Sequence, residues 1–164
     1  MIPIRQTIVR RGTGYSRREW RLILKGAWAL AGRAWVTNTL PKHFTEAGAI
    51  QYRYTPRHGK YTQSKRRVHG HQLPLVWSGT LRRQVTRRRD IRPFANRMRI
   101  VLHGPQYTTL RGGGGPDKAR ELTAVSDRDA TQIARVMEQA IQNAVDSGRG
   151  ARHIIYDGGA AGAA

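Results

Sequence analysis

The sequence has no cysteine, which excludes disulfide bridges, cysteine-based zinc sites and a cysteine nucleophile. It also has no long hydrophobic run. The most apolar stretch, residues 27–36, is far shorter than the ~20 residues that span a membrane, and Arg33 interrupts it. The first residues lack the apolar segment of a secretory signal peptide. We therefore expect a soluble protein that is made in a cytoplasm.

Acidic residues are almost absent from the first two thirds of the chain. Residues 1–116 contain 24 lysines and arginines but only three acids, whereas residues 117–164 contain six basic and seven acidic residues. Arginine outnumbers lysine by 25 to 5, and its planar guanidinium binds phosphate and carboxylate groups through two hydrogen bonds. A GC-rich genome would raise the arginine content, but it would not remove the acids. The formal charge of +20 therefore predicts a polyanion or an acidic protein as partner.

The length of 164 residues suits one domain with flanking arms. Residues 1–15 are rich in arginine and glycine and predict a basic N-terminal arm. Residues 148–164 predict a Gly/Ala-rich C-terminal tail, in which residues 153–156 could add a strand or dock on a neighbour. Between these segments, residues 16–147 predict a single α+β domain.

Two amphipathic helices are predicted, over residues 16–39 and 126–147. A serine suited to N-capping stands at the start of each, and Ser16 forms a capping box with Glu19. Pro41 ends the first helix, because proline has no backbone N–H and clashes with the preceding turn. The expected core or interface residues are Trp20, Trp28, Trp35, Trp77, Ile133, Met137 and Ile141.

The segment between the helices predicts a small antiparallel sheet. Residues 50–54 alternate as in a strand, and residues 91–94 and 97–102 predict two strands of a hairpin. Residues 81–92 have a weak pattern that fits either a strand, overlapping the hairpin, or a helical turn. Residues 55–72 predict a long basic loop, too polar to fold on itself and ordered only against a neighbouring subunit or a lumen. We expect an α+β fold in which the first and last helices cover one face of the sheet.

No group of residues forms a catalytic pattern. His58, His69 and His71 lie in a cationic segment that has no acid to complete a zinc site. The glycines at 112–115 lack the Lys-Ser/Thr of a phosphate-binding loop, and Ser78 is not in a GxSxG turn. We expect no catalytic residues, no metal and no cofactor.

The basic central segment is the strongest signal for function. Residues 51–92 contain twelve lysines and arginines and one acid, with tyrosine and tryptophan interleaved. Such residues suit a phosphate backbone and stacked bases, but also an acidic protein surface. The sequence leaves both partners open. The residues expected to face DNA or a partner are Arg53, Arg57, Lys60, Lys65, Arg66, Arg67, Arg82, Arg83, Arg87, Arg88 and Arg89.

The order of these pieces resembles a family of virion proteins. A first helix leads to a basic segment, to the step Leu73-Pro-Leu-Val-Trp-Ser-Gly-Thr-Leu81, to a hairpin, and to Glu121-Leu-Thr-Ala-Val-Ser126 before the last helix. This order resembles the head–tail joining proteins of tailed bacteriophages, the neck, tail-completion and tail-terminator group. The matched step consists of Pro74, Leu75, Ser78, Gly79 and Leu81, and the resemblance covers about residues 16–147.

The resemblance implies a small α+β fold, no catalysis, and a homo-oligomeric ring at the head–tail junction of the virion. A six-fold ring is the expectation, touching adjacent neck, portal or tail-tube proteins and letting DNA pass. A twelve-fold adaptor docked on the portal is the alternative within this class. The alternative from another class is a nucleic-acid-binding protein without sequence specificity.

Overall fold

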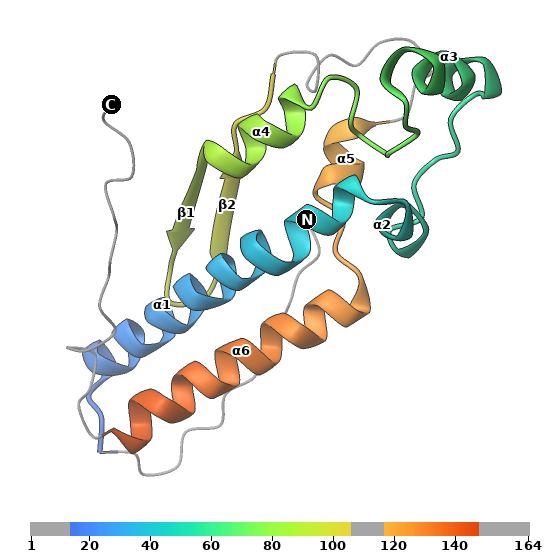
Figure 1. Cartoon of the computed structure of the whole chain (residues 1–164). Coiled ribbons are helices and arrows are strands. Elements are labelled where there is room, and N and C mark those ends of the chain that lie inside the picture. The colour runs from blue at the N-terminus through green and yellow to red at the C-terminus, as the bar shows by residue number, and fades with distance from the viewer. Residues whose placement is uncertain (1–13, 106–116, 148–164) are drawn as a thin grey trace.

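The computed structural model describes residues 14–105 and 117–147 and has an α+β fold (Figure 1). The predicted N-terminal arm before residue 14, the glycine-rich segment at 111–116 and the predicted C-terminal tail lie outside the described residues. The elements, in chain order, are α1 (Arg17–Ala34), the π-helical turn η1 (Trp35–Thr39), the 3-10 turn η2 (Leu40–Phe44), α2 (Glu46–Gln51), α3 (Gly59–His69), α4 (Thr80–Arg87), β1 (Arg89–Pro93), β2 (Met98–Leu102), α5 (Lys118–Leu122) and α6 (Asp127–Asp146). No described helix is both long and apolar enough to span a bilayer.

The helix α1 lies between the hairpin β1–β2 and α6 (Figure 1). The α+β class and the pairing of a long N-terminal helix with a C-terminal helix and an antiparallel sheet were predicted from the sequence and are confirmed. The layering differs from the prediction, because α6 packs along α1 and not on the sheet. The two strands are too short to support both helices, so α1 presents one side to the hairpin and another to α6.

The start of α1 follows from its capping box. The Ser16 hydroxyl accepts a hydrogen bond from the Glu19 backbone N–H, and the Glu19 carboxylate accepts one from the Ser16 N–H at 2.8 Å. The α-helix ends at Ala34, but the chain stays helical through η1 and η2 to Phe44. Pro41 therefore does not end the helical path. It lies in the first turn of η2, where a missing N–H costs no hydrogen bond.

The core is formed where α1, η1 and η2 meet α4 and α6. Trp28, Trp35, Ile133 and Met137 are buried there, together with Leu40, Phe44, Leu81 and Val85. Trp20 and Ile141 are half-buried, and Trp77 is 41% exposed. Trp77 therefore does not belong to this core.

The hairpin has the expected strands and alternation. Ile91 pairs with Ile100, and both lie partly buried beside the core, whereas Arg92 pairs with Arg99 on the exposed face. The end of α1 and the hairpin approach closely at Gly32, where a methyl group would lie 2.8 Å from the Ile91 side chain.

The predicted strand at residues 50–54 is wrong. Residues up to Gln51 belong to α2, whose N-cap Thr45 accepts a hydrogen bond from the Gly48 N–H at 3.0 Å. The chain then turns through Arg53, which has a left-handed φ of 52°. Tyr52 is an apolar position in this stretch because its ring is buried against His43, and no strand forms there.

The predicted loop at 55–72 is also wrong, because α3 forms within it. His58 caps α3 through a hydrogen bond from the Lys60 N–H, and Gly70 ends it with a left-handed φ of 70°. Lys65 is 3% exposed and its ammonium donates to the Leu73 carbonyl. Helix α3 has little apolar surface, and it is stabilised by its two caps and by the buried Lys65.

Of the two structures left open for 81–92, a weak strand or a helical turn, the helix forms over most of the length, as α4. Leu81 and Val85 are four residues apart and both buried, so one face of α4 packs on the core. Only from Arg89 does the chain become a strand.

Candidate functional site

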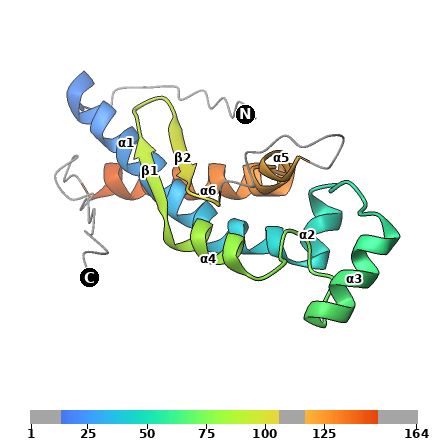
Figure 2. The ribbon, with the colours of Figure 1, turned by 90° about the horizontal axis from the view of Figure 1, so that it is seen from above.

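Five arginines line the outside of α4 and the start of β1. The five are all exposed, because Leu81 and Val85 on the opposite side of α4 face the core: Arg82, Arg83, Arg87, Arg88 and Arg89. The helix leads directly into the strand, so the arginines follow one another along the chain (Figure 2). Within residues 14–105 and 117–147, none of the five guanidinium groups forms an ion pair.

The exposed face of the hairpin continues this basic surface. Arg92 and Arg99 lie directly opposite each other on the two strands, and such a like-charge pair is destabilising. The neighbouring acid Asp90 contacts Arg92 at 3.5 Å and His103 at 3.3 Å, and the Arg97 guanidinium lies 5.1 Å from the Phe94 ring centre. The candidate residues named from the sequence stop at Arg89. The alternation of residues 97–102 was the signal that could have added the arginines of the hairpin.

The candidate cations on and around α3 divide into two groups. Arg53, Lys60, Arg66 and Arg67 are exposed. Lys65 is buried, and this burial lowers its pKa.

Arg57 is also turned inward, where it forms an ion pair with Glu121 of α5. Nine of the eleven candidate cations are thus available to a partner, and Arg57 and Lys65 instead hold the structure together.

A buried polar cluster joins η2, α2, α5 and α6. His43 is fully buried and stacks on Tyr52 with 3.9 Å between ring centres. Its Nδ1 lies 2.6 Å from the Tyr54 hydroxyl and 3.1 Å from the Glu121 carbonyl oxygen. Burial lowers the pKa of His43 to about 4, so the ring is neutral at pH 7. A carbonyl oxygen can only accept, so the contact with the Glu121 carbonyl is a hydrogen bond in the tautomer that carries the proton on Nδ1. No pattern in the sequence predicted this cluster, because its residues come from separate elements.

Asp129 anchors the other side of the cluster. Its carboxylate accepts hydrogen bonds from the Ser126 N–H at 3.1 Å and hydroxyl at 2.7 Å, and Lys42 lies 3.8 Å away. Burial alone would raise the pKa of Asp129, but the hydrogen bonds from Ser126, the nearby Tyr52 hydroxyl and the charge of Lys42 outweigh it and lower the pKa. The same burial raises the pKa of Tyr52 and Tyr54. These groups form a structural joint, and among the described residues no cluster of potential metal ligands is found.

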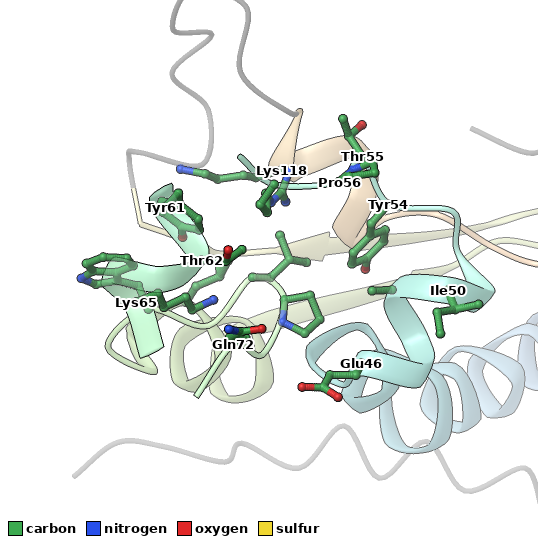
Figure 3. A pocket seen from close by; sticks show the side chains of 16 residues that line it. Glu46, Ile50, Tyr54, Thr55, Pro56, Tyr61, Thr62, Lys65, Gln72 and Lys118 are labelled. Atoms are coloured by element: carbon green, nitrogen blue, oxygen red, sulfur yellow. The ribbon is translucent and has the colours of Figure 1, made fainter. Parts of the chain in front are cut away.

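A groove of about 330 Å³ lies between α3 and the body of the protein (Figure 3). Its walls come from the end of α2, from α3, and from the segment before α4. They are largely apolar, with Ile50, Tyr61, Leu75 and Trp77 among the lining residues. Leu75 has a left-handed φ of 55°, a conformation that places strain in this wall.

No protein-family model, curated protein or solved structure matches the chain. Two surfaces of the molecule are suited to binding, the arginine surface and the groove. The arginine surface can bind anionic groups by charge and by paired hydrogen bonds. The groove can hold a few apolar side chains.

Proposed function

We propose that this chain is a structural virion protein of a tailed bacteriophage. It forms a homo-oligomeric ring, six-fold in symmetry, at the head–tail junction, where it joins the tail to the portal-connector and lets DNA pass. In this proposal the protein is not an enzyme and needs no cofactor.

The observation that carries the proposal is the unpaired arginine surface of α4 and β1. Five exposed guanidinium groups close together repel one another, and the described part of the chain supplies them with no acid. An anionic partner removes this repulsion, and at a head–tail junction both DNA and acidic neighbouring rings provide one.

The local structure of the step before α4 supports the resemblance. Gly79 stands at the N-cap of α4 with a φ of 78°, which favours glycine, and Leu81 is 3% exposed in the core. Pro74 and Leu75 line the groove. Four of the five matched residues therefore have a defined place in the fold, and the hairpin and the C-terminal helix follow in the order that the family implies.

Exposed apolar side chains support assembly into a larger particle. Ile50 is 81% exposed, Val68 is 60% exposed, and Tyr61 and Trp77 are each about 40% exposed. All four lie on α2, α3 or the segment before α4, at the end of the molecule away from the hairpin (Figures 1 and 2). Clustered exposure of this kind marks a protein–protein contact surface.

The test compares a triple variant with a matched control. Arg87, Arg88 and Arg89 are replaced by alanine in the test protein, and the exposed Arg17, Arg18 and Arg21 of α1 are replaced in the control, so both lose the same charge. Oligomeric mass is measured by size-exclusion chromatography with light scattering. DNA affinity is measured over a salt series, and particle assembly is measured by complementation.

Each outcome points to a different partner. If phosphates are the target, the test variant binds DNA of any sequence more weakly and with a flatter salt dependence than the control. If an acidic neighbour is the target, DNA binding is unchanged but heads and tails do not join. If the test variant behaves like the control in both DNA binding and particle assembly, the arginine surface no longer supports the proposed function.

A nucleic-acid-binding protein without sequence specificity is the second candidate, and the same basic surface favours it. The two functions differ in assembly. A ring with modest DNA affinity supports the neck protein, whereas a monomer at all concentrations with steeply salt-dependent DNA affinity supports the nucleic-acid binder.

A further inference from the structure

The groove beside α3 is an incomplete contact. The helix α3 makes few contacts with the rest of the described chain, and its main side-chain contacts are with the segment that follows it. Tyr61 packs on Trp77 with 5.4 Å between ring centres, yet both rings stay exposed at the groove. Ile50 lines the opposite wall and is 81% exposed. Covering such an exposed apolar wall with another apolar side chain is favourable, because it removes apolar surface from water.

The two sides of the groove carry opposite charges. Lys118 and Glu46 both line it and lie on opposite sides (Figure 3). Arg57 and Lys65 also line the groove, but Arg57 is paired with Glu121 and Lys65 is bonded to the Leu73 carbonyl, so the charge pattern is set by Lys118 and Glu46. A segment with an apolar centre and an acid at one end would match this arrangement.

The chain contains such a segment beyond α6. Residues 148–164 include three large apolar residues, Ile154, Ile155 and Tyr156, which stand together between glycine- and alanine-rich stretches. Asp157 follows them directly, and Arg152 precedes them. The order is basic, apolar, acidic, which complements Glu46, the apolar walls and Lys118.

Length decides whose groove this segment reaches. Gln51 of α2 bonds to Ser126 at 2.9 Å, so α6 begins on the groove side of the molecule and runs away from it (Figure 1). The helix to Ser147 is roughly 30 Å long at 1.5 Å per residue. Seven further residues to Ile154 span at most about 25 Å when fully extended. Ile154 therefore falls short of its own groove, and Tyr156, two residues further on, could approach it only with the chain fully extended. A second copy of the chain is the better placed receiver.

We propose that the groove between α3 and the body binds residues 152–157 of a neighbouring copy of this chain, with the Ile154–Tyr156 side chains against Ile50, Leu75 and Trp77. The inference rests on the proposed ring, because it needs a second copy. Each subunit then gives its tail to one neighbour and receives the tail of another. This head-to-tail contact closes into a ring when the rotation between subunits permits it.

The experiment uses the full-length protein with a photo-crosslinking amino acid, p-benzoylphenylalanine, at position 156. Protein labelled with nitrogen-15 is mixed with unlabelled protein, and crosslinked peptides are identified by mass spectrometry. We expect links from position 156 to the wall around Leu75, Trp77 or Ile50, and in pairs that combine a labelled with an unlabelled peptide. Links to any other surface, or links only between peptides of the same label, overturn the inference.

Two variants with matched controls measure the contribution to assembly. I154D/I155D places two charges in the apolar triplet, and A160D/A161D places the same charges further along the tail. Ile50→Glu changes the exposed groove wall, and Leu30→Glu changes an exposed position on α1. We expect the concentration needed for half-assembly to rise at least tenfold in both test variants and to stay unchanged in both controls.

These outcomes separate the inference from the proposed function. A ring that keeps its mass in both test variants overturns the tail contact and leaves the ring standing. A wild-type chain that is monomeric at every concentration overturns both.

Discussion

Replacing Gly48 by alanine should destabilise the protein, although alanine is the better helix former. Gly48 lies in α2, where the backbone folds back over η2. A methyl group on Gly48 would collide with the Lys42 carbonyl oxygen and lie 2.7 Å from its carbonyl carbon. Backbone atoms cannot rotate away as a side chain can, so η2 and α2 must move apart.

The expected size follows from three effects. Helix propensity favours alanine by about 1 kcal/mol. Overpacking costs typically about 1–3 kcal/mol, and here the obstacle is backbone, so the upper end applies. The Thr45 cap, which binds the Gly48 N–H, is worth about another 1 kcal/mol and is lost when the turn shifts. We expect the free energy of unfolding to fall by about 2–3 kcal/mol.

The assay is thermal unfolding of Gly48→Ala beside Gly59→Ala. Gly59 begins α3, and a methyl group there would meet no atom within 4 Å. At roughly 4 °C per kcal/mol, Gly48→Ala should melt about 10 °C below the wild type, and Gly59→Ala should melt at or above it. Equal melting temperatures for the two variants would show that α2 and η2 do not approach as described.

Two further predictions concern the interior. His43, with a pKa of about 4 when folded and 6.5 when unfolded, binds a proton only in the unfolded chain between these values. Its contribution to stability is therefore complete above about pH 6.5 and is lost as the pH falls towards 4. When the free energy of unfolding is measured in urea at several pH values, its dependence on pH between 4 and 6.5 should be weaker in His43→Phe than in the wild type. An unchanged pH dependence would mean that other groups cause it. Ile133→Ala should cost about 2–5 kcal/mol because Ile133 is 5% exposed, whereas Ile141→Ala, at a half-buried site, should cost less. Equal costs would mean that the buried face of α6 is misassigned.

The elements that were predicted correctly are those with local signals. The capping box at Ser16 and the serine before α6 mark helix starts that both form, and both helices have a long apolar stripe. The hairpin was predictable because Met98, Ile100 and Leu102 alternate with Arg97, Arg99 and Val101 along the second strand. In each case the information lies within a few residues along the chain.

The secondary-structure predictions fail in short segments, where the spacing of apolar residues fits both a helix and a strand. Leu81 and Val85, four residues apart, give α4 a helical spacing that the clustered arginines conceal. Apolar and polar residues alternate at 50–54 as in a strand, but the Thr45 cap starts a helix that runs to Gln51 and is followed by a turn. The sequence of α3 has caps at both ends, His58 and Gly70, and little apolar pattern between them. Polarity alone therefore does not exclude a helix.

The candidate site was predictable in part. The exposed arginines of α4 and β1 follow from composition, because so many charges cannot be buried. The inward positions of Arg57 and Lys65 were not predictable, since their partners are Glu121, 64 residues away, and the Leu73 carbonyl. The groove and the His43 cluster also arise from residues distant in sequence. No local pattern contains them.

The fold also makes the surface more basic than the net charge suggests. Two of the acids in the last third are used internally: Glu121 pairs with Arg57, and Asp129 lies buried beside Lys42 and caps α6. Asp90 contacts Arg92 and His103 on the hairpin. These acids are therefore not available to the arginines of α4, whose nearest neighbours along the chain are further arginines. Among the described residues, these three acids do not neutralise the arginine surface, and in the proposed function an anionic partner molecule supplies its counter-charge. The binding of that molecule should weaken as salt shortens the Debye length from about 10 Å at 0.1 M to about 3 Å at 1 M.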